Sequence, residues 1–89
     1  MLEPSLVITF RRGKPWVAYY YLPHEGARHA QESERVEPGL VVDYGPSGSP
    51  IGIEITAPAL VSFEPFNALL TRLGQRPVTA QEFAPLHVA

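Results

Sequence analysis

Residues 40–55 read LVVDYGPSGSPIGIEI, two alternating runs around a segment rich in glycine, proline and serine. Successive side chains of a strand point to opposite faces, so this pattern predicts two antiparallel strands joined by a short turn. With Gly48 in the left-handed position of that turn, Val42 would lie opposite Ile51. One face of the hairpin is then apolar and is expected to belong to the core: Leu40, Val42, Tyr44, Ile51, Ile53 and Ile55.

The opposite face of this hairpin carries the carboxylates Asp43 and Glu54, together with Gly52. In the register above, Glu54 lies opposite Gly39, about 13 Å from Asp43 at ~3.3 Å per strand residue. Catalytic carboxylates of glycosidases lie roughly 5 to 9.5 Å apart, so the sequence predicts no catalytic pair. We interpret both carboxylates as solvated outer-face residues that discourage aggregation between sheets.

Three further segments before residue 40 complete the predicted sheet. Residues 5–10 and 16–22 are rich in β-branched and aromatic side chains, and Gly13 between them can adopt the positive φ of a hairpin turn. Residues 23–30 have no apolar period and contain proline and glycine, which predicts a loop. Residues 31–37 are expected to form a weaker, polar strand.

The hydrophobic period changes to that of a helix after about residue 60. Ser62 is a suitable N-cap for a first helix, and Gly74 is suitable for its C-terminal cap. Thr79 and Glu82 have the spacing of a capping box, which predicts a second helix that ends near Pro85.

The whole chain is therefore predicted to be a single α+β domain, residues 1–89. A mainly antiparallel β-meander of about five strands occupies residues 5–57, and two C-terminal helices within residues 62–85 pack on one of its faces. The length of 89 residues fits one domain, and 45% hydrophobic with 18% charged residues is typical of globular proteins.

Charge and cysteine content restrict the expected environment and partners. The chain has no cysteine, which excludes disulfides, thiolate metal sites and a cysteine nucleophile. The apolar run in residues 6–10 is far too short for a signal peptide or a membrane span. We expect a cytoplasmic protein without a membrane partner. The net charge of -2 gives no general attraction to nucleic acids.

The histidines are the residues to examine for a metal site. His24, Glu25 and His29 lie within a predicted loop, and the two histidines are five residues apart with Gly26 between them. Zinc-binding histidines of protease helices are four residues apart on one face, so we expect no metal and no cofactor here. His87, close to the end of the sequence, is expected to be frayed.

The dense basic cluster of the sequence is residues 11–14, RRGK, beside an aromatic run. Alternation sends Tyr19 and Tyr21 to one face of the strand and Tyr20 to the other, so the three cannot form one stacking platform. Trp16 is expected in the core. We therefore expect no nucleic-acid partner.

Residues 32–55, preceded by the aromatic strand 18–22, resemble the small bacterial proteins grouped as domain of unknown function 2283. The resemblance covers roughly residues 5–57, although Gly45 and Ser47 stand where that family tends to have acidic residues. It implies a compact domain of strands and helices and no established activity. The matching residues are Glu32, Arg35, Val36, Gly39, Asp43, Tyr44, Gly48, Gly52, Ile53 and Glu54.

Both faces of the first predicted hairpin are largely apolar, whereas two short helices can cover only one face of the sheet. We therefore expect a homodimer or a larger homo-oligomer, with a further protein partner as an option.

The function that fits best is a non-catalytic protein-interaction or assembly module. One alternative is an antitoxin-like regulator that binds a toxin partner, and another is an enzyme with a site assembled at an oligomer interface. Such a site would draw on Asp43, Gly52, Glu54, His24 and His29.

Overall fold

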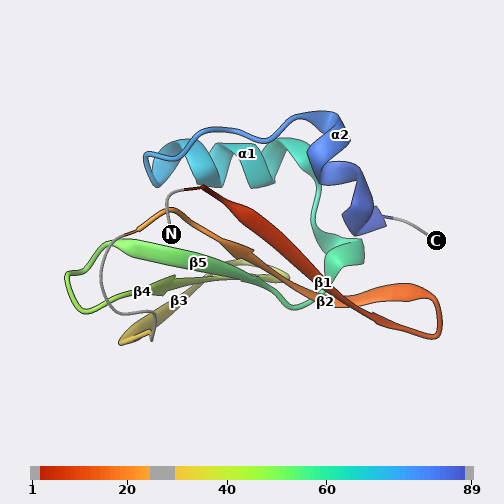
Figure 1. Cartoon of the computed structure of the whole chain (residues 1–89), viewed down its shortest axis with the longest axis horizontal. Helices are drawn as coiled ribbons and strands as arrows, with labels where there is room; N and C mark the ends of the chain where they lie inside the picture. Colours follow the sequence, from red (N-terminus) through yellow and green to blue (C-terminus); the bar gives the residue numbers. More distant parts are fainter. Residues whose placement is uncertain (1–2, 25–29, 88–89) are drawn as a thin grey trace.

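The computed structural model describes residues 3–24 and 30–87 and contains two layers, a sheet and a set of helices (Figure 1). The predicted α+β fold is confirmed, because a five-stranded antiparallel sheet precedes two helices that lie on one of its faces. The strands are β1 (Ser5–Arg11), β2 (Lys14–Tyr21), β3 (Glu32–Glu37), β4 (Leu40–Tyr44) and β5 (Pro50–Ile55). The helices are α1 (Phe63–Arg72) and α2 (Ala80–Phe83), with the 3-10 turns η1 (Pro58–Leu60) and η2 (Ala84–His87).

The strand order of the sheet is β1-β2-β5-β4-β3, and every neighbouring pair is antiparallel. The last strand, β5, therefore lies in the middle, where it joins the β1–β2 hairpin to the β3–β4–β5 meander. The chain passes from β2 to the far edge of the sheet before β3 begins. β1 and β3 are consequently the two edge strands.

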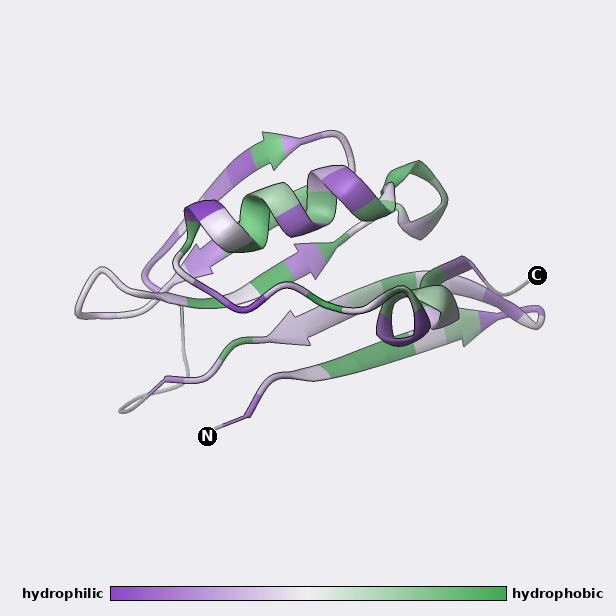
Figure 2. Cartoon of the chain, turned by 90° about the horizontal axis from the view of Figure 1, so that it is seen from above, coloured by the Kyte–Doolittle hydropathy of each residue, from purple (hydrophilic) through white to green (hydrophobic). Residues whose placement is uncertain are grey.

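A hydrophobic core fills the space between the sheet and the helices, which lie over the strands when seen from above (Figure 2). The Phe66 ring of α1 lies edge-on to Tyr20 of β2, with centroids 5.6 Å apart, and contacts Phe83 of α2 at 5.7 Å. Full burial of a large apolar side chain stabilises a fold by about 1.5–3 kcal/mol. The buried core residues also include Leu22, Leu40, Val42, Ile53, Ile55, Val61, Leu69, Leu70, Val78 and Leu86.

The face of the sheet turned away from the helices is called here the open face. Because side chains alternate along each strand, the pairing of the strands assigns its members. They are Ser5, Val7, Thr9, Val17, Tyr19, Tyr21, Ser33, Arg35, Val41, Asp43, Gly52 and Glu54.

The predicted capping box of α2 and the predicted glycine cap of α1 are both present. The Thr79 backbone N–H donates to Glu82 Oε1 at 2.8 Å, and the Glu82 N–H donates to Thr79 Oγ1 at 3.1 Å, which completes the capping box. Gly74 has a φ of 75° after α1, and the Gln75 N–H donates to the Leu70 carbonyl at 2.8 Å, as in a Schellman motif. The predicted N-cap serine precedes α1, but its side chain forms no capping hydrogen bond.

The amide of Asn67 fastens α1 to the segment before α2. Its Nδ2 donates to the Val78 carbonyl at 2.9 Å, and its Oδ1 accepts from the Val78 N–H at 2.8 Å. This pair of bonds holds buried Val78 against the core and sets the position at which α2 begins.

Two aromatic residues lie elsewhere than predicted. Trp16 is 52% exposed instead of buried, because the β1–β2 hairpin extends past the helices that would cover it (Figure 1). His87 is held in place instead of being frayed. Its Nε2 atom lies 2.8 Å from the Val61 carbonyl oxygen, and its ring packs on Phe83 with centroids 5.1 Å apart. Within residues 3–24 and 30–87, no helix is long and apolar enough to cross a membrane.

Candidate functional site

The pairing of β4 with β5 differs by two residues from the predicted register. Val42 lies opposite Ile53 instead of Ile51. One residue of this difference arises at the turn, where Tyr44 pairs with Pro50 and not with Ser49, and the other arises at the irregularity between Asp43 and Tyr44. A shift of two residues leaves every side chain on its predicted face, which is why the apolar face was predicted correctly. The same shift moves Glu54 two residues closer to Asp43 along the sheet.

Asp43 is buried, with 5% of its surface exposed, so its interpretation as a solvated outer-face residue was wrong. The Tyr19 hydroxyl donates to Asp43 Oδ2 at 2.9 Å, and the Ser33 hydroxyl donates to Asp43 Oδ1 at 2.6 Å. Both carboxylate oxygens therefore accept hydrogen bonds, one from β2 and one from β3. A buried carboxylate requires such partners, because an unpaired charge is costly to remove from water.

Gly52 provides the space in which Tyr19 reaches Asp43. It lies between Tyr21 of β2 and Asp43 of β4 in one row across the sheet. A Cβ atom added to Gly52 would overlap the ring and the hydroxyl of Tyr19. Glycine is thus the residue that lets a tyrosine cross β5 and bond to a strand that is not its neighbour.

Glu54 lies next to this group, opposite Tyr19 on one side and Val41 on the other. Its solvated interpretation was also wrong, because the side chain is half-buried. A hydrogen bond with Asp43, supported by burial and by repulsion from that carboxylate, raises the pKa of Glu54 to about 7. Burial, followed by the bond to Asp43, also raises the pKa of Tyr19. The Glu54 carboxyl group therefore holds a proton close to neutral pH.

The structure thus unites three of the predicted site residues, Asp43, Gly52 and Glu54, on the open face. His24 follows β2 and does not join them, and His29 lies outside the described residues. The described part of the chain contains no group of three or more histidine, aspartate or glutamate side chains suited to hold a metal ion. With its raised pKa, Glu54 can exchange a proton near neutral pH.

Tyr19 and Ser33 are the members of this group that sequence reasoning missed. Alternation placed Tyr19 on the outer face, but nothing in the sequence indicated that its hydroxyl crosses another strand. The signal that could have found it is Gly52, a residue without a side chain inside an alternating strand, where a neighbouring side chain can lie across the backbone.

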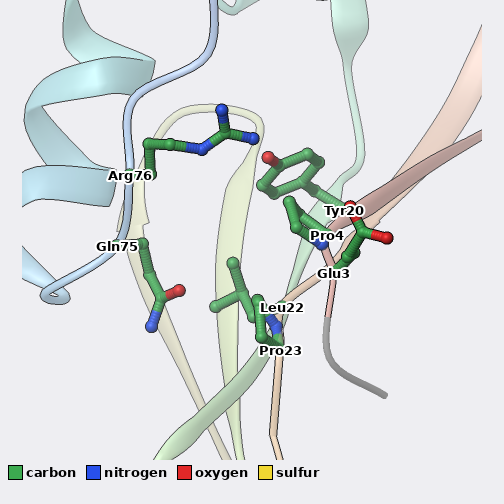
Figure 3. Close-up of a pocket in the computed structure, with 7 residues that line it drawn as sticks. All are labelled: Glu3, Pro4, Tyr20, Leu22, Pro23, Gln75 and Arg76. Carbon is green, nitrogen blue, oxygen red and sulfur yellow. The ribbon is translucent and has the colours of Figure 1, made fainter.

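A second candidate is a pocket of about 360 Å³ between β2 and the connection that follows α1 (Figure 3). Arg76 extends over this pocket toward Tyr20, while Leu22 lies at its base (Figure 3). Burial raises the pKa of the Tyr20 hydroxyl, an effect that Arg76 opposes. Glu3 lies on the other side, so the charges lining the pocket are balanced and select no charged ligand.

No family model matches the chain, and no curated protein or solved structure is significantly similar to it. The resemblance to the family of domain of unknown function 2283 therefore stays a prediction.

Proposed function

We propose that this protein is a non-catalytic protein-interaction or assembly module, and that it acts as a homodimer or larger homo-oligomer joined through the open face. The cytoplasmic location expected from the sequence is part of this proposal. The helices cover one face of the sheet only (Figure 1). On the other, Val7 is 50% exposed, and Tyr19, Tyr21 and Val41 are only partly buried. An apolar band of this kind is typical of a protein interface.

The observation that carries the proposal is the internal pairing of the polar groups on the open face. Both oxygens of Asp43 accept hydrogen bonds from Tyr19 and Ser33, and Glu54 is hydrogen-bonded to the same carboxylate. Covering a polar group with a partner costs free energy when its hydrogen bonds to water are lost without replacement. Because these groups bond to one another, a partner can cover them at a smaller cost.

A two-fold pairing of this face is the simplest assembly, since the same surface then serves both copies. Tyr19 and Tyr21 have ring centroids 4.6 Å apart and form a continuous aromatic surface. Tyrosine suits an interface because it combines a large apolar ring with a polar hydroxyl.

Light scattering at low micromolar concentration tests the proposal. We expect a mass near twice the 9.8 kDa chain mass or more. Val7→Glu and Tyr21→Glu should give monomers, whereas Thr71→Glu, on the exposed side of α1, is the matched control and should leave the mass unchanged. A monomer mass that stays constant over a tenfold rise in concentration would contradict the proposal.

An enzyme with a site completed at the oligomer interface is the second candidate, and one observation favours it. A carboxyl group with a pKa of about 7, such as Glu54, suits general acid or base catalysis at neutral pH. Hydrolysis of ester and glycoside substrates that is lost in Glu54→Gln, with the oligomer mass preserved, would support it. In the antitoxin-like alternative the same face would bind a toxin chain, and a toxin gene next to this one would favour that use.

A further inference from the structure

The β1–β2 hairpin ends in a two-residue turn that extends past α2 on the right of Figure 1. Arg12 has a φ of 54° and Gly13 a φ of 78°, so both central residues of the turn are left-handed. Asparagine followed by glycine is the favoured sequence for such a turn, because a longer side chain is strained in the left-handed region. The strained position makes Arg12 a candidate for a functional side chain.

The residues at this end, 11–16, are called here the hairpin tip, and they concentrate positive charge. Arg11, Arg12 and Lys14 are all exposed, although the whole chain has only seven lysine and arginine residues. Together with Pro15 and Trp16 they line a shallow hollow of about 510 Å³. No acidic residue of the described chain lines this hollow, so its potential is positive.

Trp16 adds an aromatic surface to these charges. The indole is half exposed, and the Arg11 guanidinium lies 5.3 Å from its ring centroid. Tryptophan is the best aromatic partner for a cation, and a base can stack on the same indole beside the arginine. The sequence argument against a nucleic-acid partner considered only the tyrosines as stacking residues, and the exposure of Trp16 adds an aromatic surface that it did not include.

We propose that the hairpin tip binds single-stranded nucleic acid, with a base stacked on Trp16 and the neighbouring phosphates held by Arg11, Arg12 and Lys14. Stacking on aromatic rings and positively charged grooves are the two elements of single-strand binding. This function goes beyond the proposed oligomer and uses a different surface. The tip lies at the end of the hairpin, whereas the open-face tyrosines lie farther along β2.

The order of the residues along the hairpin favours this ligand over an anionic membrane. The outermost residues are the charged Arg12 and the small Gly13, and the aromatic Trp16 lies behind them. Insertion of the indole into a bilayer would carry the arginines past the lipid headgroups, which is unfavourable. A single strand of nucleic acid that lies along the side of the hairpin can contact the indole ring and the positive charges at the same time.

Binding is tested with a fluorescein-labelled oligothymidylate at low salt, followed by fluorescence anisotropy and by the emission of Trp16, the only tryptophan of the chain. We expect saturable binding with quenching of the tryptophan. For three phosphate contacts, the logarithm of the affinity should fall against the logarithm of salt with a slope of about -2, since each contact to a single strand contributes roughly 0.7.

Substitution of Arg12→Asn separates binding from folding. It creates the favoured asparagine-glycine turn, so the melting temperature should stay the same or rise while the salt slope becomes shallower by about 0.7. Trp16→Ala should weaken binding roughly 5- to 160-fold through the loss of stacking. Arg72→Gln, which removes an exposed cation from α1, is the control and should change neither affinity nor slope.

Three results would overturn the proposal. The first is no binding of the oligothymidylate at low salt, and the second is binding that Arg12→Asn and Trp16→Ala leave unchanged. The third is tighter binding to phosphatidylserine vesicles, or to polyglutamate at matched charge, than to the oligothymidylate. Binding that both tip variants weaken, with unchanged oligomer mass, supports the proposal.

Discussion

The Tyr19 hydroxyl donates a hydrogen bond to Asp43 Oδ2 at 2.9 Å, and this bond passes over a strand that contains neither residue. Tyr19 lies on β2, Asp43 lies on β4, and the intervening strand β5 presents Gly52 at the crossing point. This bond connects the two halves of the sheet on the open face, as the helices do on the other.

Removal of this hydroxyl by Tyr19→Phe should lower the free energy of unfolding by about 1.5–3 kcal/mol, the usual range for a hydrogen bond to a charged group. Urea denaturation at neutral pH gives the value. The control is Tyr44→Phe, which removes an exposed and longer bond, 3.3 Å, to Glu34 and should have a smaller effect. A loss for Tyr19→Phe as small as the one expected for the control would show that the bond to Asp43 does not stabilise the fold.

A methyl group at Gly52 should force Tyr19 away from Asp43. We expect Gly52→Ala to lower the free energy of unfolding by about 1–3 kcal/mol, the usual cost of overpacking. The same change should lower the free energy of unfolding by less in a Tyr19→Ala background, where the ring that the methyl group would overlap is absent. A double-mutant cycle measures this coupling, and additive effects would contradict the crossing at Gly52.

The stability of the protein should depend on pH through Glu54. Its pKa is raised from 4.5 to about 7 in the folded chain, so the folded state holds a proton that the unfolded state has lost. The contribution of Glu54 to stability is therefore complete below pH 4.5 and decreases as the pH rises to about 7. Glu54→Gln should remove this decrease and be more stable than the natural chain at pH 8.

Melting temperatures of both proteins between pH 4.5 and 8 give the comparison. Glu64→Gln alters an exposed carboxylate of α1 and is the matched control. A difference between Glu54→Gln and the natural chain that stays constant over this range would contradict the coupling with Asp43.

Loss of the Asn67 amide should release the segment before α2. Asn67→Ala removes both hydrogen bonds to Val78 and should lower the free energy of unfolding by about 1–3 kcal/mol. Gln81→Ala, on the exposed surface of α2, is expected to have little effect. Hydrogen exchange should locate the loss, because the Val78 amide would then exchange faster than the amides of β5.

The sequence was sufficient for the elements and the faces but not for the register. Alternation assigned both Val42 and Ile53 to the core. This assignment does not depend on which residues pair across the two strands, because a shift of two residues preserves the faces. The distance between Asp43 and Glu54 depends on that shift, which arises from the length of the turn and from an irregularity beside it, and alternation encodes neither. Trp16 was misplaced for a different reason, since its burial depends on how far the helical layer extends over the hairpin.

The central position of β5 has a consequence for the order of folding. The β4–β5 hairpin closes a short loop and can form early. The pairing of β2 with β5, which includes Tyr20 and Ile53, must close a much longer loop. Until β2 pairs with β5, one edge of β5 is unpaired and apolar. Such an edge can pair with a strand of another chain. The rate at which the β1–β2 hairpin docks onto β5 therefore sets how long each newly made chain is exposed to aggregation.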